Sequence, residues 1–214
     1  IMQISEYNTA GSNFEISDDV ASVISAGSGV IENGGVSRID VTDVADVSEG
    51  VELNSYSANV EFDVQGTADA IATNAGDLGK ADDVVVVSGD VTITEAQSIQ
   101  GLAGYNASAS AYEIEDSAAS ITASNDQLMQ NGTIKVDVTD TDVNASVGAD
   151  LAAFTADIDF DVADTAANIA AQIAAGNRLP SSGTAFISIK DSDKVKILPV
   201  AKKLVSIGFD LVAT

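Results

Sequence analysis

The chain has 214 residues with 33 acidic and 9 basic side chains, a formal net charge of -24, and neither cysteine nor histidine. This charge argues against nucleic acid or an anionic membrane as a partner. The absence of cysteine excludes disulfides and thiol chemistry, and the absence of histidine removes the commonest general base. No segment approaches the roughly 18 consecutive apolar residues of a membrane-spanning helix, so we expect no membrane insertion.

One short pattern occurs four times along the chain, and each copy begins with an aromatic residue. These residues, 48, 50 and 48 positions apart, are Phe14, Phe62, Tyr112 and Phe160. Self-similarity with this period is typical of repeat architectures, in which each unit buries its apolar face against its neighbours. We therefore expect the four aromatic residues to be equivalent, buried core anchors.

A second apolar pattern falls between these copies and is centred on Val41, Val87 and Val138, which makes the step a half-unit of about 24 residues. Each step opens with alternating apolar and polar residues, which predicts a strand. An alanine-rich run follows and predicts a short helix, because alanine is the best helix former. Over 165–175, for example, Asp164 or Thr165 can cap such a helix.

Strands joined by helices run parallel, with right-handed crossovers. The expected fold class is therefore α/β, with tandem strand-helix repeats stacked as a solenoid-like array around a parallel sheet. A β-rich alternative, with antiparallel hairpins in sandwich-like repeats, treats the alanine-rich runs as loops. We expect two regions: an acidic repeat region over 1–170, with 30 acidic and 3 basic side chains, and a basic segment over 171–214, with 3 and 6.

The acidic region carries a characteristic phrase at Asp164–Ala171, which reads Asp-Thr-Ala-Ala-Asn-Ile-Ala-Ala. The phrase resembles the Ala-, Thr- and Asp-rich repeats of large bacterial surface-layer and adhesin-type proteins. This resemblance implies an extracellular structural role.

The basic segment has its own pattern of elements. Its residues predict a buried strand over 185–190, a helix over 192–207 and a second strand over 209–213, which form one βαβ unit. Residues 176–194 and 199–214 resemble the start of the methylglyoxal-synthase-like regulatory domain of the carbamoyl phosphate synthase large subunit. In that family a pocket for a phosphate-bearing effector is lined by positions that correspond to Ser188, Lys194 and Thr214.

Aspartate residues cluster where the repeat strands are predicted to end. Hard oxygen ligands at alternate positions suit Ca²⁺, whereas the simpler interpretation is a solvated face with turn-forming aspartates. No EF-hand loop or glycine-aspartate nonapeptide is present, so no cofactor is required and calcium is an option. The candidate ligands are Asp40, Asp43, Asp137, Asp140, Asp142, Asp159 and Asp161.

The sequence supports two main functional hypotheses, and a third, less specific one is a cytoplasmic halophile protein whose acidity is an adaptation to salt. The first is an extracellular, non-enzymatic repeat protein of a surface layer, filament or adhesin that associates with its own copies as a homo-oligomer or polymer, with calcium as an organiser. The second is a regulatory module that binds a phosphorylated small-molecule effector through the C-terminal segment. The charge break near Ala171 favours the first hypothesis over the second.

Overall fold

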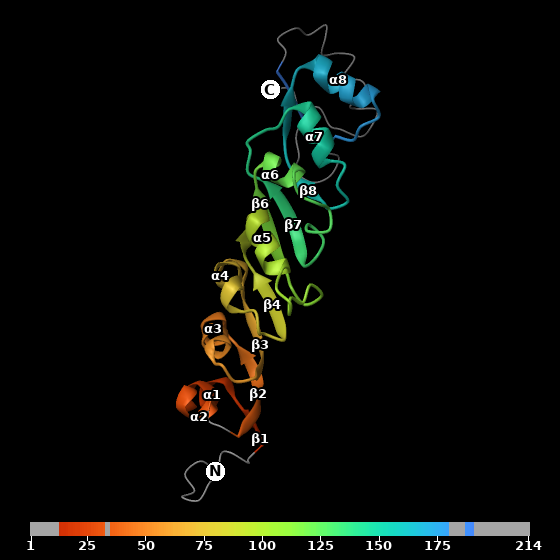
Figure 1. The fold of residues 1–214 in the computed structure, drawn as a ribbon. Helices are drawn as coiled ribbons and strands as arrows, with labels where there is room; N and C mark the ends of the chain where they lie inside the picture. The colour runs from red at the N-terminus through yellow and green to blue at the C-terminus, as the bar shows by residue number, and fades with distance from the viewer. Residues whose placement is uncertain (1–12, 33–34, 180–186, 191–214) are drawn as a thin grey trace, which may run out of the picture. The chain divides into compact units, whose positions relative to one another are not determined.

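The computed structural model describes residues 13–32, 35–179 and 187–190, in which strands alternate with helices (Figure 1). The chain divides into two compact units, Ile1–Tyr112 and Glu113–Thr214. No helix among these described residues is long and apolar enough to cross a membrane.

The first unit contains a parallel sheet whose strands follow one another in chain order. They are β1 (Phe14–Asp18), β2 (Val36–Ala45), β3 (Val60–Thr67) and β4 (Asp83–Ser88). The short strand β5 (Asp90–Val91) follows in the chain and does not belong to this sheet. Phe14 pairs with Val36, and Asp63 pairs with Asp83, so residues about one predicted step apart lie side by side. This pairing is what strand-helix-strand connections produce.

Short helices connect these strands, and Figure 1 shows α1, α3 and α4 along the same side of the sheet. Their bounds are α1 (Val20–Ala26), α2 (Ser28–Ile31), α3 (Val47–Ser55), α4 (Ala68–Asn74) with the 3-10 turn η2 (Ala75–Asp77), and α5 (Ile93–Gln100). Polar side chains cap the N-terminal ends of α1, α3, α4 and α5, since the first amides of a helix lack internal partners. Asp46 with Glu49 and Thr92 with Glu95 form complete capping boxes.

The second unit repeats the alternation. Its strands β6 (Tyr112–Asp116), β7 (Thr133–Val138) and β8 (Ile158–Asp159) are consecutive neighbours in a sheet, and β9 (Val162–Asp164) pairs in parallel with β10 (Ile187–Ile189). The helices are α6 (Ala118–Thr122), α7 (Ala145–Leu151) and α8 (Ala166–Ala174). Strand β6 begins at the last residue of the first unit.

Three of the four repeated aromatic residues lie in the core as expected, and the prediction is wrong for Phe14. Phe62, Tyr112 and Phe160 are 2%, 0% and 5% exposed, which confirms their burial, while Phe14 is half-buried. Phe14 belongs to β1, which has one described neighbour, β2, and therefore has less apolar surface beside it. Phe62 belongs to β3, which lies between β2 and β4.

Two helix glycines show how closely the helices approach the strands. A Cβ atom at Gly50 of α3 would lie 2.6 Å from a methyl group of Val64, and one at Gly148 of α7 would lie 2.7 Å from a methyl group of Val162. Glycine costs helix stability, so its use here reflects tight packing. Gly50 and Gly148 are 98 residues apart, which is two repeat periods.

The structure confirms the α/β class with parallel sheets. The hairpin alternative is wrong for the first unit, where β1, β2, β3 and β4 pair in parallel and the alanine-rich runs are helices. The helix predicted over 165–175 is α8, capped by Thr165. The strand predicted over 185–190 is present as β10, but its described side chains are half-buried or exposed, whereas the elements predicted over 192–207 and 209–213 lie outside the described residues.

Candidate functional site

Three aspartates cap the N-terminal ends of helices in the preceding strand-helix step. Each carboxylate accepts the amide N–H of the first residue of a helix that lies about 20 residues earlier in the chain, consistent with the repeat step. The pairs are Asp43 Oδ1 with Val20 N at 2.7 Å, Asp140 Oδ2 with Ala118 N at 2.7 Å, and Asp164 Oδ2 with Ala145 N at 3.0 Å. The free amides and the helix dipole both favour a carboxylate there, so these aspartates link consecutive strand-helix steps.

A second set of hydrogen bonds joins a side chain to the backbone of the step that follows it in the chain. The acceptor side chains lie at or after the C-terminal ends of helices, and the donors are amide N–H groups of the next step. The pairs are Glu32 Oε1 with Ser57 N at 2.6 Å, Asn54 Oδ1 with Lys80 N at 2.9 Å, and Asp126 Oδ1 with Thr155 N at 2.8 Å. The backbone bond from Ser57 lowers the pKa of Glu32, and hydrogen bonding by Thr155 lowers the pKa of Asp126. Polar side chains thus bind neighbouring steps at both ends of the helices.

The strands of the first unit carry a row of charged side chains. Arg38 forms ion pairs with Glu61 at 2.5 Å and with Glu15 and Asp40 at 3.9 Å. Further along the row Asp63 pairs in register with Asp83. Burial, together with the negative charges of Asp83 and Asp82, raises the pKa of Asp63. One arginine therefore offsets part of the repulsion within this row.

The candidate calcium ligands are distributed among separate interactions. Asp43 and Asp140 cap helices, Asp40 pairs with Arg38, and Asp137 pairs with Lys135 at 2.7 Å. The remaining candidates are Asp142, which pairs with Lys190, and Asp159 and Asp161, which also have interaction partners. Among the described residues, no group of three acidic side chains is arranged to hold a metal ion. Calcium binding stays a prediction from the sequence.

Calcium dependence can be measured directly. If clustered carboxylates bind the ion in the native state only, thermal melts in Ca²⁺ and in a chelator, at constant ionic strength, should differ by several degrees. Melts in Mg²⁺ provide the control for general divalent screening. Identical melts in all conditions would contradict calcium binding and leave only the screening of a chain with a charge of -24.

The start of the C-terminal segment is joined to the last repeat step. Ser188 of β10 pairs with Ala163 of β9, and the Lys190 amide donates to the carbonyl of Asp164 at 3.0 Å. The Lys190 ammonium pairs with Asp142 at 3.2 Å. Asp164 thus bonds to the C-terminal segment through its backbone and to α7 through its carboxylate. Local sequence patterns indicated Asp164 only as a cap of α8.

The predicted effector positions are only partly described. Ser188 lies on β10 and has an exposed side chain. Lys194 and Thr214 lie outside the described residues. The structure therefore places one of the three predicted positions and shows the strand that carries it.

A short stretch of the chain matches known proteins. It is 59% identical over 44 residues to the carbamoyl phosphate synthase large chain, C-terminal section, of Methanopyrus kandleri, which amounts to 21% of this chain and 8% of that protein. The large chains of Acidobacterium capsulatum, 52% identical over 44 residues, and Methanobrevibacter smithii, 54% identical over 43, are each covered over 4% of their length. No family model and no solved structure matches the chain.

These matches support the resemblance of the C-terminal segment to the synthase. They also overturn the prediction of an extracellular surface-layer, adhesin or filament protein, because the relatives are chains of a carbamoyl phosphate synthase rather than surface proteins. The structure explains why the phrase at Asp164–Ala171 misled. Asp164 caps α7, Thr165 caps α8, and Ala166 is buried where α8 begins, so these three residues have structural roles within the fold.

Proposed function

We propose that the chain is a regulatory module that binds a phosphorylated small-molecule effector through its C-terminal segment. The observation that carries this proposal is the 50–59% identity of a 44-residue stretch to carbamoyl phosphate synthase large chains. The exposed position of Ser188 on β10 is consistent with it. Under this proposal the chain binds its effector without chemical turnover.

The strand-helix steps form the support for the effector segment in this proposal. We infer that they stack as a solenoid-like array over the acidic region 1–170, followed by the basic segment 171–214. The recurrent bonds between consecutive steps, such as Asp43 to Val20 and Asp140 to Ala118, support such stacking. In arrays of this kind each step is stabilised by its neighbours. Association of the chain with its own copies stays a separate prediction from the sequence.

Asp164 provides a physical route by which effector binding could alter the array. Its carbonyl accepts the Lys190 amide and its carboxylate accepts the Ala145 amide. A ligand that stabilises β10 would therefore stabilise β9 and the start of α7 as well. A ligand can shift such an element only by the difference in its affinity for the two states.

The effector site can be tested by calorimetric titration of the full chain with nucleoside monophosphates. We expect saturable binding in the wild type. Lys194→Ala should weaken it by about tenfold or more, because a charged donor to phosphate is lost. Ser188→Ala should weaken it less, since a neutral hydroxyl contributes less than an ammonium group.

Lys196→Ala is the matched control, because it removes a lysine from the same segment at a position to which the resemblance assigns no role. It should leave the affinity unchanged. The absence of saturable binding in the wild type would contradict the proposal, and so would equal losses in Lys194→Ala and Lys196→Ala. Thermal melts of each variant should accompany the titrations to establish that the repeat steps remain folded.

A further inference from the structure

Two polar side chains lie on the same face of β10 and of the residue that follows it. Ser188 and Lys190 are exposed, whereas the two isoleucines of β10 are half-buried. The Lys190 amide donates to the carbonyl of Asp164 at 3.0 Å, so the pairing with β9 continues as far as Lys190. Since side chains alternate between the two faces of a strand, the Ser188 hydroxyl and the Lys190 ammonium group project to the same side.

The Lys190 ammonium group already pairs with an anion of this chain. Its Nζ atom lies 3.2 Å from Asp142 Oδ1, and the two side chains are 56% and 41% exposed. Asp142 lies three positions before α7 begins at Ala145, outside the stretch that resembles the synthase, so the resemblance does not predict this contact. An exposed ion pair contributes little to stability, because water screens both charges. It therefore opens at little cost when another anion competes for the lysine.

A phosphate group competes well for this ammonium group. A phosphomonoester carries a charge of about -1.5 to -2 at pH 7, whereas a carboxylate carries a single negative charge. Lysine binds phosphate as a point charge on a flexible four-carbon side chain. Positions two apart along a strand are separated by about 7 Å, so a phosphate bound at Ser188 lies within reach of Lys190.

We propose that Lys190 is a further effector-binding residue and that Asp142 competes with the effector's phosphate for its ammonium group. This role rests on the effector function proposed above and concerns the regulation of the same site. In the free chain Asp142 pairs with Lys190. Effector binding replaces this ion pair by one with phosphate and leaves the Asp142 carboxylate to water. Asp142 thereby lowers the affinity of the chain for its effector.

Lys190 and Asp142 should change the affinity in opposite directions. The measurement is calorimetric titration of the full chain with adenosine, guanosine, cytidine and uridine monophosphates. Lys190→Ala should weaken binding by about three- to tenfold, because a charged contact with phosphate is lost. Asp142→Asn should strengthen binding by about two- to fivefold, because it removes the competing charge and keeps the size of the side chain.

Lys135 and Asp137 provide matched controls, because they form another lysine–aspartate ion pair of the same unit, at 2.7 Å. Lys135→Ala and Asp137→Asn make the same changes of charge and should leave the affinity unchanged. The double variant of Lys190→Ala and Asp142→Asn should bind about as weakly as Lys190→Ala, because Asp142 acts through the ammonium group. Thermal melts should establish that all variants fold.

The outcomes separate this role of Asp142 from the effector function itself. If Lys194→Ala weakens binding but neither Lys190→Ala nor Asp142→Asn changes it, the competition is overturned and the effector function stands. Weaker binding by Asp142→Asn would also overturn the competition, because Asp142 would then hold Lys190 in place for the ligand. The absence of binding by the wild type would overturn both. Opposite shifts in the two variants, with unchanged affinities in the controls, support the competition.

Discussion

Phe62→Ala should lower the free energy of unfolding of the first unit by about 3–5 kcal/mol. The ring is 2% exposed and belongs to β3, which has strand neighbours on both sides. Truncation removes the buried ring and leaves a cavity that the surrounding core, which includes the fully buried Val64 two positions along the same strand, fills only in part. Urea denaturation followed by circular dichroism measures the loss.

Phe14→Ala is the matched control, since Phe14 opens the first copy of the same repeat but is only half-buried. Its loss should be less than half that of Phe62→Ala, because the truncation removes less apolar surface from the core. Phe160→Ala, at 5% exposure in the second unit, should resemble Phe62→Ala. Equal losses for Phe14 and Phe62 would contradict the idea that burial by neighbouring steps determines the contribution of each aromatic residue.

The elements that the sequence predicts correctly depend on neighbouring residues. Thr165 precedes an alanine-rich run, so the start of α8 follows from capping and helix propensity within a few positions. The strands around Phe62 and Val136 follow from the alternation of apolar and polar residues. Such patterns are local, and the period of the aromatic residues then shows that they recur.

The bonds between steps were not predicted, because they join residues that are far apart in the chain. Asp43 and Val20 are 23 positions apart, and no local rule distinguishes this aspartate from a solvated turn residue. A periodic signal was nonetheless present, because Gly50 and Gly148 are separated by two periods and mark equivalent close contacts between helix and strand. Searching each residue type for the repeat period could have identified such positions.

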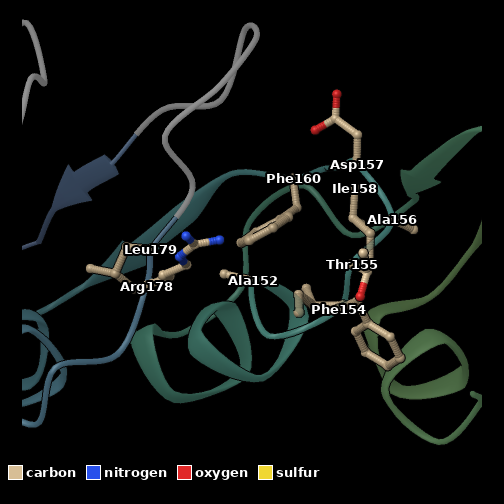
Figure 2. Close-up of a pocket in the computed structure, with 10 residues that line it drawn as sticks. Ala152, Phe154, Thr155, Ala156, Asp157, Ile158, Phe160, Arg178 and Leu179 are labelled. Atoms are coloured by element: carbon tan, nitrogen blue, oxygen red, sulfur yellow. The ribbon is translucent and has the colours of Figure 1, made fainter. Parts of the chain in front are cut away.

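The candidate sites show the same difference between local patterns, which the sequence predicts, and contacts between distant residues, which it does not. The resemblance that singled out Ser188 rests on a continuous stretch, and its strand is observed as β10. A hollow beside Arg178 is lined by residues of α7, the loop that follows it and residues 178–179 (Figure 2). Such a grouping of residues that are distant in the chain is seen only in the folded protein.

Asp164→Ala should lower the free energy of unfolding of the second unit by about 2–3 kcal/mol, because a cap is lost and charged hydrogen bonds are broken. The carboxylate accepts the Ala145 amide at 3.0 Å, the Thr165 amide at 2.7 Å and the Asn168 side-chain amide at 2.7 Å. Ala145 is 1% exposed, so water cannot easily replace its partner. Urea denaturation provides the measurement.

Asp150→Ala is the control for charge alone. Asp150 is an exposed residue near the C-terminal end of α7, where the helix dipole disfavours a negative charge. Its removal should leave the stability unchanged or slightly higher. A loss as large as that of Asp164→Ala would mean that general charge, and not the cap, determines the stability of this unit.

The pH dependence of stability gives an independent test of the same carboxylate. Burial acts to raise the pKa of Asp164, but hydrogen bonds from Ala145, Asn168 and Thr165 outweigh it and lower the pKa overall. The stabilisation is therefore complete above the ordinary aspartate pKa of about 3.9 and is lost as the pH falls through the lower pKa of the folded state. Asp164→Asn should show a shallower loss of stability below about pH 4 than the wild type. Parallel stability curves for the two proteins would contradict a role for the ionised carboxylate in joining α7, α8 and the C-terminal segment.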